Sequence, residues 1–317
     1  MNIQILNLGI AFLITFILGL IAVPKLRKLK VGQIVRDDGP KEHYKKSGTP
    51  TMGGIIILIT MVIMLGFYSI KYPLLILPLI VILGFGLVGF LDDYKKLVKK
   101  TSEGLSPKMK IIGLFLVICV FIMLYLNVFN LSTELIIPFI NQPYTLSIGA
   151  FVVFTTFILL AASNAVNLTD GLDGLASGIV AIIMTFFTLV AIKNNDMEMI
   201  ILGSTSVGTC LAFLLFNIYP AKMFMGDTGS LAIGGALASI AIITKMPLYL
   251  AIVAIVCIIE TISVILQVGY FKLTKGKRLF KMAPFHHHLE LSGVKETKIV
   301  ILFWIITAIM CVIAYFV

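Results

Sequence analysis

The sequence predicts an all-α, polytopic integral membrane protein with ten transmembrane helices in a single domain, 1–317. Of the 317 residues, 59% are hydrophobic and only 13% are charged, whereas soluble domains are about one quarter charged. A soluble chain of this size could not bury so much apolar surface, but a lipid bilayer can solvate it. The apolar residues also gather in stretches of about 20, the length that a helix needs to cross a bilayer.

Ten apolar stretches can each form one span, and Pro or Gly residues separate most of them. The predicted spans cover residues 3–23, 52–70, 74–91, 111–129, 148–166, 175–192, 199–219, 228–244, 248–269 and 298–316. The first stretch has no basic residues before it and no small-residue cleavage site after it, so we expect it to remain a span. Segment 131–147 contains Pro, Asn and Tyr, which favours a short hairpin.

The basic residues predict how the chain is oriented in the membrane. Twenty-two of the 25 Lys and Arg residues lie in four loops, 24–50, 92–110, 220–227 and 271–298. Because positively charged loops stay in the cytoplasm, we expect both termini on the extracytoplasmic side and five loops forming the site on the cytoplasmic face. The net charge of +10 then reflects topology and affinity for anionic headgroups, and it does not indicate nucleic acid binding.

Acidic residues gather at the ends of predicted spans on that same face. Asp92 and Asp93 end the third span in FLDDYKK, Asp170 and Asp173 follow the fifth span in NLTDGLDGLA, and Asp227 opens the eighth in GDTGS. Any one of them alone is more simply a solvated helix end, because an acid costs far less at the interface than the roughly 2.5–3.5 kcal/mol at mid-bilayer. Three such clusters on one face instead indicate a shared cavity.

The chemistry that fits such a cavity is phosphoryl transfer with Mg²⁺, which binds through one or two carboxylates together with substrate phosphates. Lys46, Lys96 and Lys108 could neutralise phosphate oxygens, although on charge alone Lys96 and Lys108 are typical positive-inside loop residues. The GDTGS run before a predicted helix offers backbone N–H groups to an anion. A less favoured alternative is an ordinary helix cap.

Five motifs resemble one known family. KKSGTPTMGG, FLDDYKK, NLTDGLDGLA, FNIYPAKMFMGDTGS and MAPFHHHLE occur at 45–54, 90–96, 167–176, 216–230 and 282–290. In this order they resemble the phospho-N-acetylmuramoyl-pentapeptide-transferase family, bacterial enzymes that make lipid I. The Asp pair and the NLTDGLDG segment are similar to the wider polyprenyl-phosphate N-acetylhexosamine-1-phosphate transferase superfamily. The GTPTMGG and HHH segments point to the muramoyl-pentapeptide branch.

The resemblance implies a reaction and its participants. Phospho-N-acetylmuramoyl-pentapeptide would pass from its UDP carrier to undecaprenyl phosphate, giving lipid I and UMP with Mg²⁺ as cofactor. The reaction would take place at the cytoplasmic face of the bacterial inner membrane, during peptidoglycan synthesis, and the enzyme would be a homodimer. The nearest alternative is a related transferase that uses UDP-N-acetylglucosamine. A transporter or channel is disfavoured because its polar site should lie near mid-membrane.

The resemblance also implies roles for individual residues. Asp227 is expected to bind Mg²⁺, and Asp92 and Asp93 match the family's catalytic aspartate pair. A larger set is expected to bind substrate: Lys46, Thr51, Lys96, Lys108, Asn167, Asp170, Asp173, Asn217, Phe224, Gly226, His286, His287 and His288. Phe224 would stack on uracil, unless it is an ordinary interfacial aromatic residue, and Asp173 could accept the uracil N–H.

Two reaction schemes are compatible with these residues. A phosphate monoester has a second pKa near ~6, so the lipid phosphate is mostly ionised and can attack directly, with Asp92 and Asp93 orienting it and the metal. Alternatively, an aspartate is the nucleophile and forms a covalent phospho-sugar intermediate. We favour direct attack.

Two further features stand apart from the acidic clusters. Glu260 lies near the middle of the ninth span, where a carboxylate is a functional candidate by default or else hydrogen-bonds a neighbouring helix. We expect this span to bend and to border the groove for the lipid phosphate. His286, His287 and His288 invite a zinc interpretation, which we disfavour because zinc sites usually space their ligands.

Overall fold

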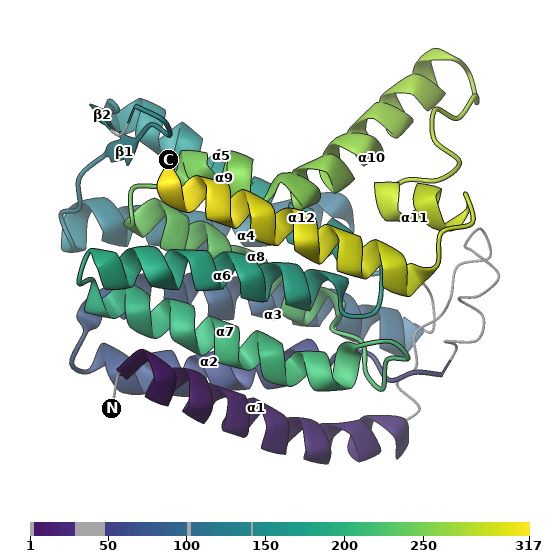
Figure 1. The fold of residues 1–317 in the computed structure, drawn as a ribbon, viewed down its shortest axis with the longest axis horizontal. Helices are drawn as coiled ribbons and strands as arrows, with labels where there is room; N and C mark the ends of the chain where they lie inside the picture. Colours follow the sequence, from purple (N-terminus) through teal and green to yellow (C-terminus); the bar gives the residue numbers. More distant parts are fainter. Residues whose placement is uncertain (1–2, 29–47, 100–102, 141) are drawn as a thin grey trace.

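The computed structural model describes residues 3–28, 48–99, 103–140 and 142–317, and these are mainly helical (Figure 1). Within them, nine helices are long and apolar enough to cross a membrane. A shorter apolar helix, α2 (Gly54–Ser69), has 16 residues. Each predicted stretch falls on one of these helices, so the all-α, polytopic fold class is confirmed.

The helices follow one another with few intervening elements. After α1 (Ile3–Lys28) and α2 come α3 (Ile76–Lys99), α4 (Pro107–Met123), α5 (Ile148–Thr169), α6 (Leu175–Lys193), α7 (Met197–Asn217), α8 (Gly226–Ile243), α9 (Leu250–Val253), α10 (Ile255–Leu273), α11 (Phe285–Glu290) and α12 (Glu296–Phe316). Single helical turns at Pro73–Leu75 and Pro247–Tyr249 lead into α3 and α9, and a wider turn, Leu124–Val128, extends α4.

The ninth predicted span, for which the sequence predicts a bend, is interrupted. Ala254 separates α9 from α10 with backbone angles (φ −101°, ψ 23°) outside the helical range. Beyond this break α10 leaves the bundle at an angle (Figure 1). Its apolar residues Ile262, Ile265 and Leu266 are exposed, so the projecting helix presents an apolar face.

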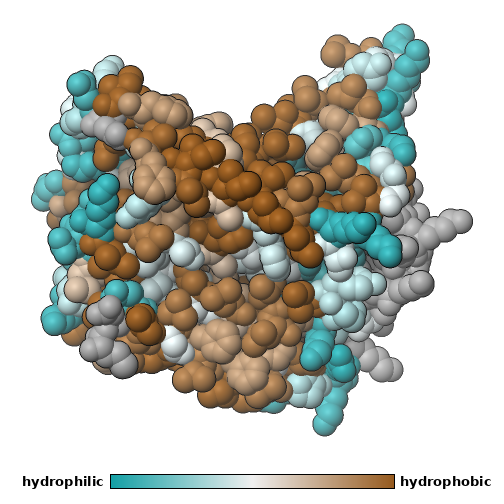
Figure 2. All heavy atoms as spheres, viewed as in Figure 1, coloured by the Kyte–Doolittle hydropathy of each residue, from teal (hydrophilic) through white to brown (hydrophobic). Residues whose placement is uncertain are grey.

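Both termini lie at one end of the bundle, and α11 lies at the other end (Figure 1). The termini share their end with the predicted hairpin, in which β1 (Glu134–Ile136) pairs antiparallel with β2 (Pro143–Thr145). Figure 2 shows a brown, apolar belt between teal, polar ends. Such a belt is what a membrane-spanning protein presents to the hydrocarbon core.

The hairpin holds the far end of α8. The Ile136 N–H donates to the carbonyl oxygen of Lys245 at 2.7 Å, just beyond the end of the helix. The Lys245 Nζ in turn contacts Glu134 Oε2 at 2.6 Å. The residue after the α8 cap is therefore tied to β1 through both its backbone and its side chain.

Helices α6, α7 and α8 form the centre of the bundle. In their most apolar segments 78%, 83% and 83% of the residues are buried, against 22% in α1 and α10. Small residues let α8 pack this closely, as is usual between membrane helices. Gly54 of α2 lies against the backbone of Gly229, and Gly89 of α3 lies against the carbonyl group of Asp227.

Gly89 generates a prediction about how α3 and α8 pack. A methyl group at Gly89 would overlap the Asp227 carbonyl, and forcing an extra methyl into a packed interface costs about 1–3 kcal/mol. We expect Gly89→Ala to lower the thermal unfolding temperature of the detergent-solubilised protein. Gly66→Ala in α2 is the matched control, because open space surrounds that position. Equal unfolding temperatures for the two variants would contradict the packing argument.

Candidate active site

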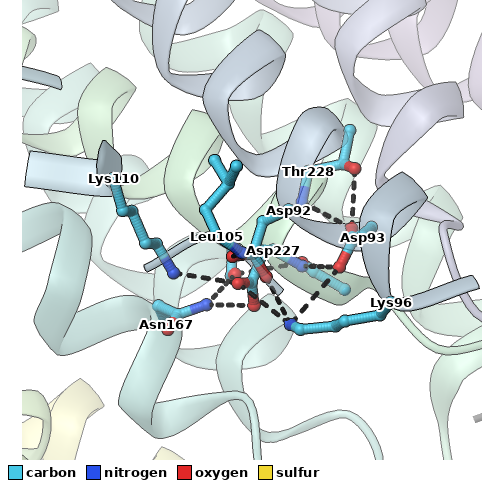
Figure 3. A network of polar contacts seen from close by, with 10 residues as sticks. Asp92, Asp93, Lys96, Leu105, Lys110, Asn167, Asp227 and Thr228 are labelled. Carbon is cyan, nitrogen blue, oxygen red and sulfur yellow. Dashed lines mark hydrogen bonds and ion pairs between the residues drawn. The ribbon is translucent and has the colours of Figure 1, made fainter. Parts of the chain in front are cut away.

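Three carboxylates from two helices meet in one cluster (Figure 3). It lies where α3 ends and α8 begins, at the end of the bundle opposite the termini (Figure 1). Asp92 and Asp93 lie in the last turns of α3, and Asp227 is the second residue of α8. One oxygen of each lies within 4.8 Å of the others. Asp92 and Asp93 are only 3% and 4% exposed, so the structure holds a concentrated negative charge that needs partners.

The Asp93 carboxylate caps the first turn of α8. Its Oδ1 accepts the Asp227 N–H at 3.1 Å, and its Oδ2 accepts the Thr228 N–H at 2.9 Å and the Thr228 hydroxyl at 2.7 Å. Gly226 makes this approach possible, because its φ of 74° is left-handed and a side chain there would meet the Asp93 carboxylate. The GDTGS turn is thus a helix start capped from another helix, and both oxygens of Asp93 are engaged.

Two lysines and one asparagine surround Asp227. Its Oδ2 accepts hydrogen bonds from Lys110 Nζ at 2.8 Å and Lys96 Nζ at 3.2 Å. Its Oδ1 accepts one from Asn167 Nδ2 at 2.9 Å, and that amide also donates to Ser230 Oγ. Helices α3, α4, α5 and α8 therefore each contribute a side chain to one polar network (Figure 3).

Asp92 lies on the cavity side of this network. Lys96 Nζ contacts its Oδ2 at 2.5 Å, and the Leu105 N–H donates to its Oδ1 at 2.8 Å. The cavity has a volume of about 830 Å³ and is lined by Asp92, Lys95, Lys96, Glu103, Gly104, Leu105, Ser106, Pro107, Lys110, Asn167 and Asp227. Charged groups of both signs line this space, so it suits a ligand that carries phosphates together with a cation.

The donor set fits Mg²⁺. Carboxylate oxygens are its preferred protein ligands, and it needs only one or two of them together with substrate phosphates and water. Among the described residues, Asp92, Asp93 and Asp227 form the group of potential ligands whose atoms converge. Because Asp93 is occupied with the α8 backbone, Asp227 and Asp92 are the better placed of the three.

Lys110 belongs to the site, and reasoning from the sequence named Lys108 in its place. Lys108 is exposed in the first turn of α4, whereas Lys110 reaches Asp227. The spacing of the residues in α4 indicates which of the two lysines faces the bundle. Lys110, Leu114 and Ile118 recur at intervals of four residues and so share one face, and the latter two are fully buried.

The turn between α5 and α6 carries Asp170 and Asp173. The Asp173 carboxylate accepts the Ala221 N–H at 2.9 Å, and its own N–H donates to Glu296 Oε1 at 2.8 Å. Asn217 Oδ1 accepts the Gly174 N–H at 3.0 Å. Asp173 and Asn217 are both buried, and their contacts join the α5–α6 turn to the segment that leads into α8.

The surroundings of Asp170 disfavour the ionised form of its carboxyl. Burial raises the pKa of its carboxyl well above the ordinary value, and the nearby acids Asp227, Asp93 and Asp173 raise that pKa further. Asp227 and Asp93 belong to the network around α8, so the Asp170 carboxyl shares the electrostatic environment of the three converging carboxylates.

The other predicted nucleotide residues lie along the segment beside α8. The Phe224 N–H donates to the Pro50 carbonyl at 2.7 Å, and the Gly53 N–H donates to the Phe224 carbonyl at 2.8 Å. Thr51 is half-buried and lies between these two contacts. The backbone segment that carries Thr51 is therefore adjacent to the one that carries Phe224. Lys46 falls outside the described residues.

The three histidine side chains contact three different partners. His286 Nδ1 lies 3.0 Å from Glu260 Oε2, and His287 Nδ1 lies 2.8 Å from Glu290 Oε2. His288 Nδ1 accepts the Lys281 N–H at 3.2 Å, and its ring stacks on Phe285. The triplet does not present its nitrogens to one point.

Comparison with known proteins then identifies the family. A model described as glycosyl transferase family 4 matches residues 75–245, and a phospho-N-acetylmuramoyl-pentapeptide-transferase signature matches residues 46–58. The chain is 53% identical to the phospho-N-acetylmuramoyl-pentapeptide-transferase of Acetivibrio thermocellus, over 97% of this chain and 93% of that protein. The chain belongs to the phospho-N-acetylmuramoyl-pentapeptide-transferase family.

Other members of this transferase family are similar along almost their whole length. The Bacillus subtilis protein of the same name is 47% identical, with 96% of this chain and 95% of that protein covered. The Caldicellulosiruptor bescii protein is 46% identical, with 98% and 96% covered. The resemblance drawn from the motifs is therefore confirmed, and the transferase signature includes Thr51 and the backbone that meets Phe224.

The raised pKa of Asp170 predicts a pH-dependent stability. The folded state binds the Asp170 proton more tightly than the unfolded chain, so stability falls as pH rises from about 3.9 through the folded-state pKa. Asp170→Asn removes this titration. We expect its thermal unfolding temperature, measured with EDTA, to exceed that of the wild type at pH 8 and to approach it at pH 4.

The control for this prediction is Glu198→Gln, in the first turn of α7 at the other end of that helix from Asn217. It makes the same change from acid to amide outside the acidic network, so an effect common to any such change would appear in both variants. If Asp170→Asn changed the unfolding temperature equally at both pH values, the proton would have no part in the effect.

Proposed function

We propose that this chain transfers phospho-N-acetylmuramoyl-pentapeptide from its UDP carrier to undecaprenyl phosphate, giving lipid I and UMP with Mg²⁺. The observation that carries the proposal is the convergence of Asp92, Asp93 and Asp227 with Lys96 and Lys110 at one end of an apolar bundle. A water-soluble diphosphate and a membrane-bound phosphate can meet only at such an end. The family's name supplies the substrate class.

Asp227 and Asp92 would hold the Mg²⁺. The ion would neutralise charge that develops on the diphosphate as the bond breaks. Lys96 and Lys110 can move from carboxylate to phosphate oxygens without leaving the cavity, because both ammonium groups already line it. In this role they stabilise the transferring phosphoryl group as cationic clamps do.

The lipid phosphate is the nucleophile in our scheme. Its oxygen attacks the β-phosphorus of the UDP-sugar, and the bond from that phosphorus to the bridging oxygen breaks, so UMP leaves with the electron pair. The engagement of both Asp93 oxygens with Asp227 and Thr228 supports this scheme over an Asp93 nucleophile. Asp93 instead positions the first turn of α8.

The nucleotide half of the substrate would lie along the α5–α6 turn and the segment before α8. Asn167 donates to Asp227, and Asp170 follows it in the same turn. Phe224 offers an aromatic ring beside the turn that begins α8. We assign Asp173 and Asn217 to holding this backbone, because their polar atoms bond to Ala221, Gly174 and Met223. Lys46, Thr51, His287 and His288 complete the proposed substrate set.

The site faces the cytoplasm of a bacterial inner membrane in this proposal, and both termini lie outside. The bias of Lys and Arg toward loops at the active-site end supports this orientation. The exposed apolar face of α10 would border the groove for the polyprenyl chain. We further propose that the enzyme is a homodimer, as its family resemblance implies.

The deciding experiment mixes the purified chain with Mg²⁺, undecaprenyl phosphate and either UDP-N-acetylmuramoyl-pentapeptide or UDP-N-acetylglucosamine. We expect UMP and a butanol-soluble lipid product from the first sugar nucleotide only, and none in EDTA. Asp227→Ala should give neither product while keeping a monodisperse elution profile. Turnover by that variant would refute the metal assignment, and labelled sugar trapped on the protein without lipid would refute direct attack.

Lys110 and Lys108 offer a matched test of the site. We expect Lys110→Ala to lower kcat by about 100-fold or more, since removing one stabiliser of transition-state charge typically costs 10²–10³. Lys108→Ala removes the same charge two residues away on the exposed face and should change kcat little. Comparable losses in the two variants would mean that the charge of the loop matters and the contact with Asp227 does not.

A further inference from the structure

Glu260 is a buried carboxylate for which the transfer scheme has no use. It lies on α10, fully buried, and faces an equally buried His286 in the first turn of α11. Its Oε2 lies 3.0 Å from His286 Nδ1, and its two oxygens accept the His286 backbone N–H at 3.2 and 3.3 Å. The carboxylate therefore fixes both the ring and the backbone of one residue.

The other edge of the His286 ring lies against the α5–α6 turn. A methyl group on Gly171 would overlap His286 Nε2 and lie 2.6 Å from Cε1. Nε2 is buried and has no hydrogen-bond partner among the described residues. Glu260 thus supplies the hydrogen bonds that hold this ring, and Gly171 provides the surface on which the ring rests.

Gly171 directly follows Asp170, whose N–H donates to the carbonyl of Asn167, the residue whose side chain bonds to Asp227. The remainder of the turn is held elsewhere, by Asp173 to Ala221 and by Gly174 to Asn217. The His286 ring therefore packs against the turn at the residue next to Asp170. A ring that is not oriented by Glu260 would leave that residue without its packing partner.

We propose that Glu260 is a positioning residue that acts through His286: it presses the ring against Gly171 and so holds Asp170 where the nucleotide half of the substrate binds. This inference rests on the proposed function, because it assigns Asp170 to the UDP-linked substrate. It gives the intramembrane carboxylate a role in substrate recognition at a distance, without contact with either substrate.

The first test separates the binding of the two substrates. We expect Glu260→Ala to raise KM for UDP-N-acetylmuramoyl-pentapeptide by about tenfold or more, since small displacements of binding groups are that costly, and to leave KM for undecaprenyl phosphate unchanged. Glu260→Gln should restore binding, because its amide can donate to Nδ1 while its carbonyl accepts the backbone N–H. A structural role would instead reduce the folded fraction and move neither KM.

The second test approaches the contact from the other side and does not touch Glu260. Gly171→Ala should displace the ring, and it adds no backbone strain because Gly171 is not left-handed. If the methyl group acts only through the ring, Gly171→Ala should add nothing to His286→Ala in a double-mutant cycle. Independent, multiplying effects of the two changes would overturn the proposal.

Glu198→Gln is the matched control, since it removes a carboxylate in the first turn of α7, at the other end of that helix from Asn217. It should leave both KM values as they are. A wild-type enzyme that releases no UMP from the pentapeptide substrate refutes the proposed function. An active wild type with a normal Glu260→Ala variant, or a Glu260→Gln variant as impaired as Glu260→Ala, refutes the positioning role alone.

Discussion

The site depends on one interaction, in which the Asp93 carboxylate of α3 accepts hydrogen bonds from the first turn of α8. Two backbone N–H groups and one hydroxyl converge on it, and Gly89, one turn earlier on α3, lets the two backbones touch. A helix start buried in apolar surroundings needs such partners. The same contact fixes Asp227 beside Asp92, because Asp227 is itself one of the capped residues. Packing, capping and ligand placement are therefore one arrangement.

Much of the fold was predictable because a bilayer leaves few choices. Backbone groups in lipid must be paired within a helix, so each apolar stretch could be assigned to one, and the structure has a helix at each. The break at Ala254 could be expected as a bend but not located, since AIVAIV has no Pro or Gly at that point. Which helices are central was also hidden, because α1 and α6 are both apolar and differ only in what surrounds them.

The acidic residues of the site were recognisable from the sequence, while their individual roles were not. Asp92, Asp93 and Asp227 stand in short motifs at span ends, and the structure brings them together. That Asp93 caps a helix, that Asp173 holds the backbone at Ala221 and that Glu260 meets His286 are consequences of long-range packing. No local pattern encodes contacts between residues that lie 26 to 135 positions apart in the chain. Lys110 differs, because the helical period of α4 did contain its orientation.

The hairpin between α4 and α5 has a mechanical consequence for the opposite face. The hairpin binds both the carbonyl and the side chain of Lys245, just past the end of α8. Asp93 caps the start of the same helix. A helix advances about 1.5 Å per residue along its axis, so slippage by a single residue would carry Asp227 out of reach of its neighbours. Because α8 is tied at both ends, its position along its own axis is fixed. A small sheet on one side of the membrane therefore helps to hold Asp227 in place on the other side.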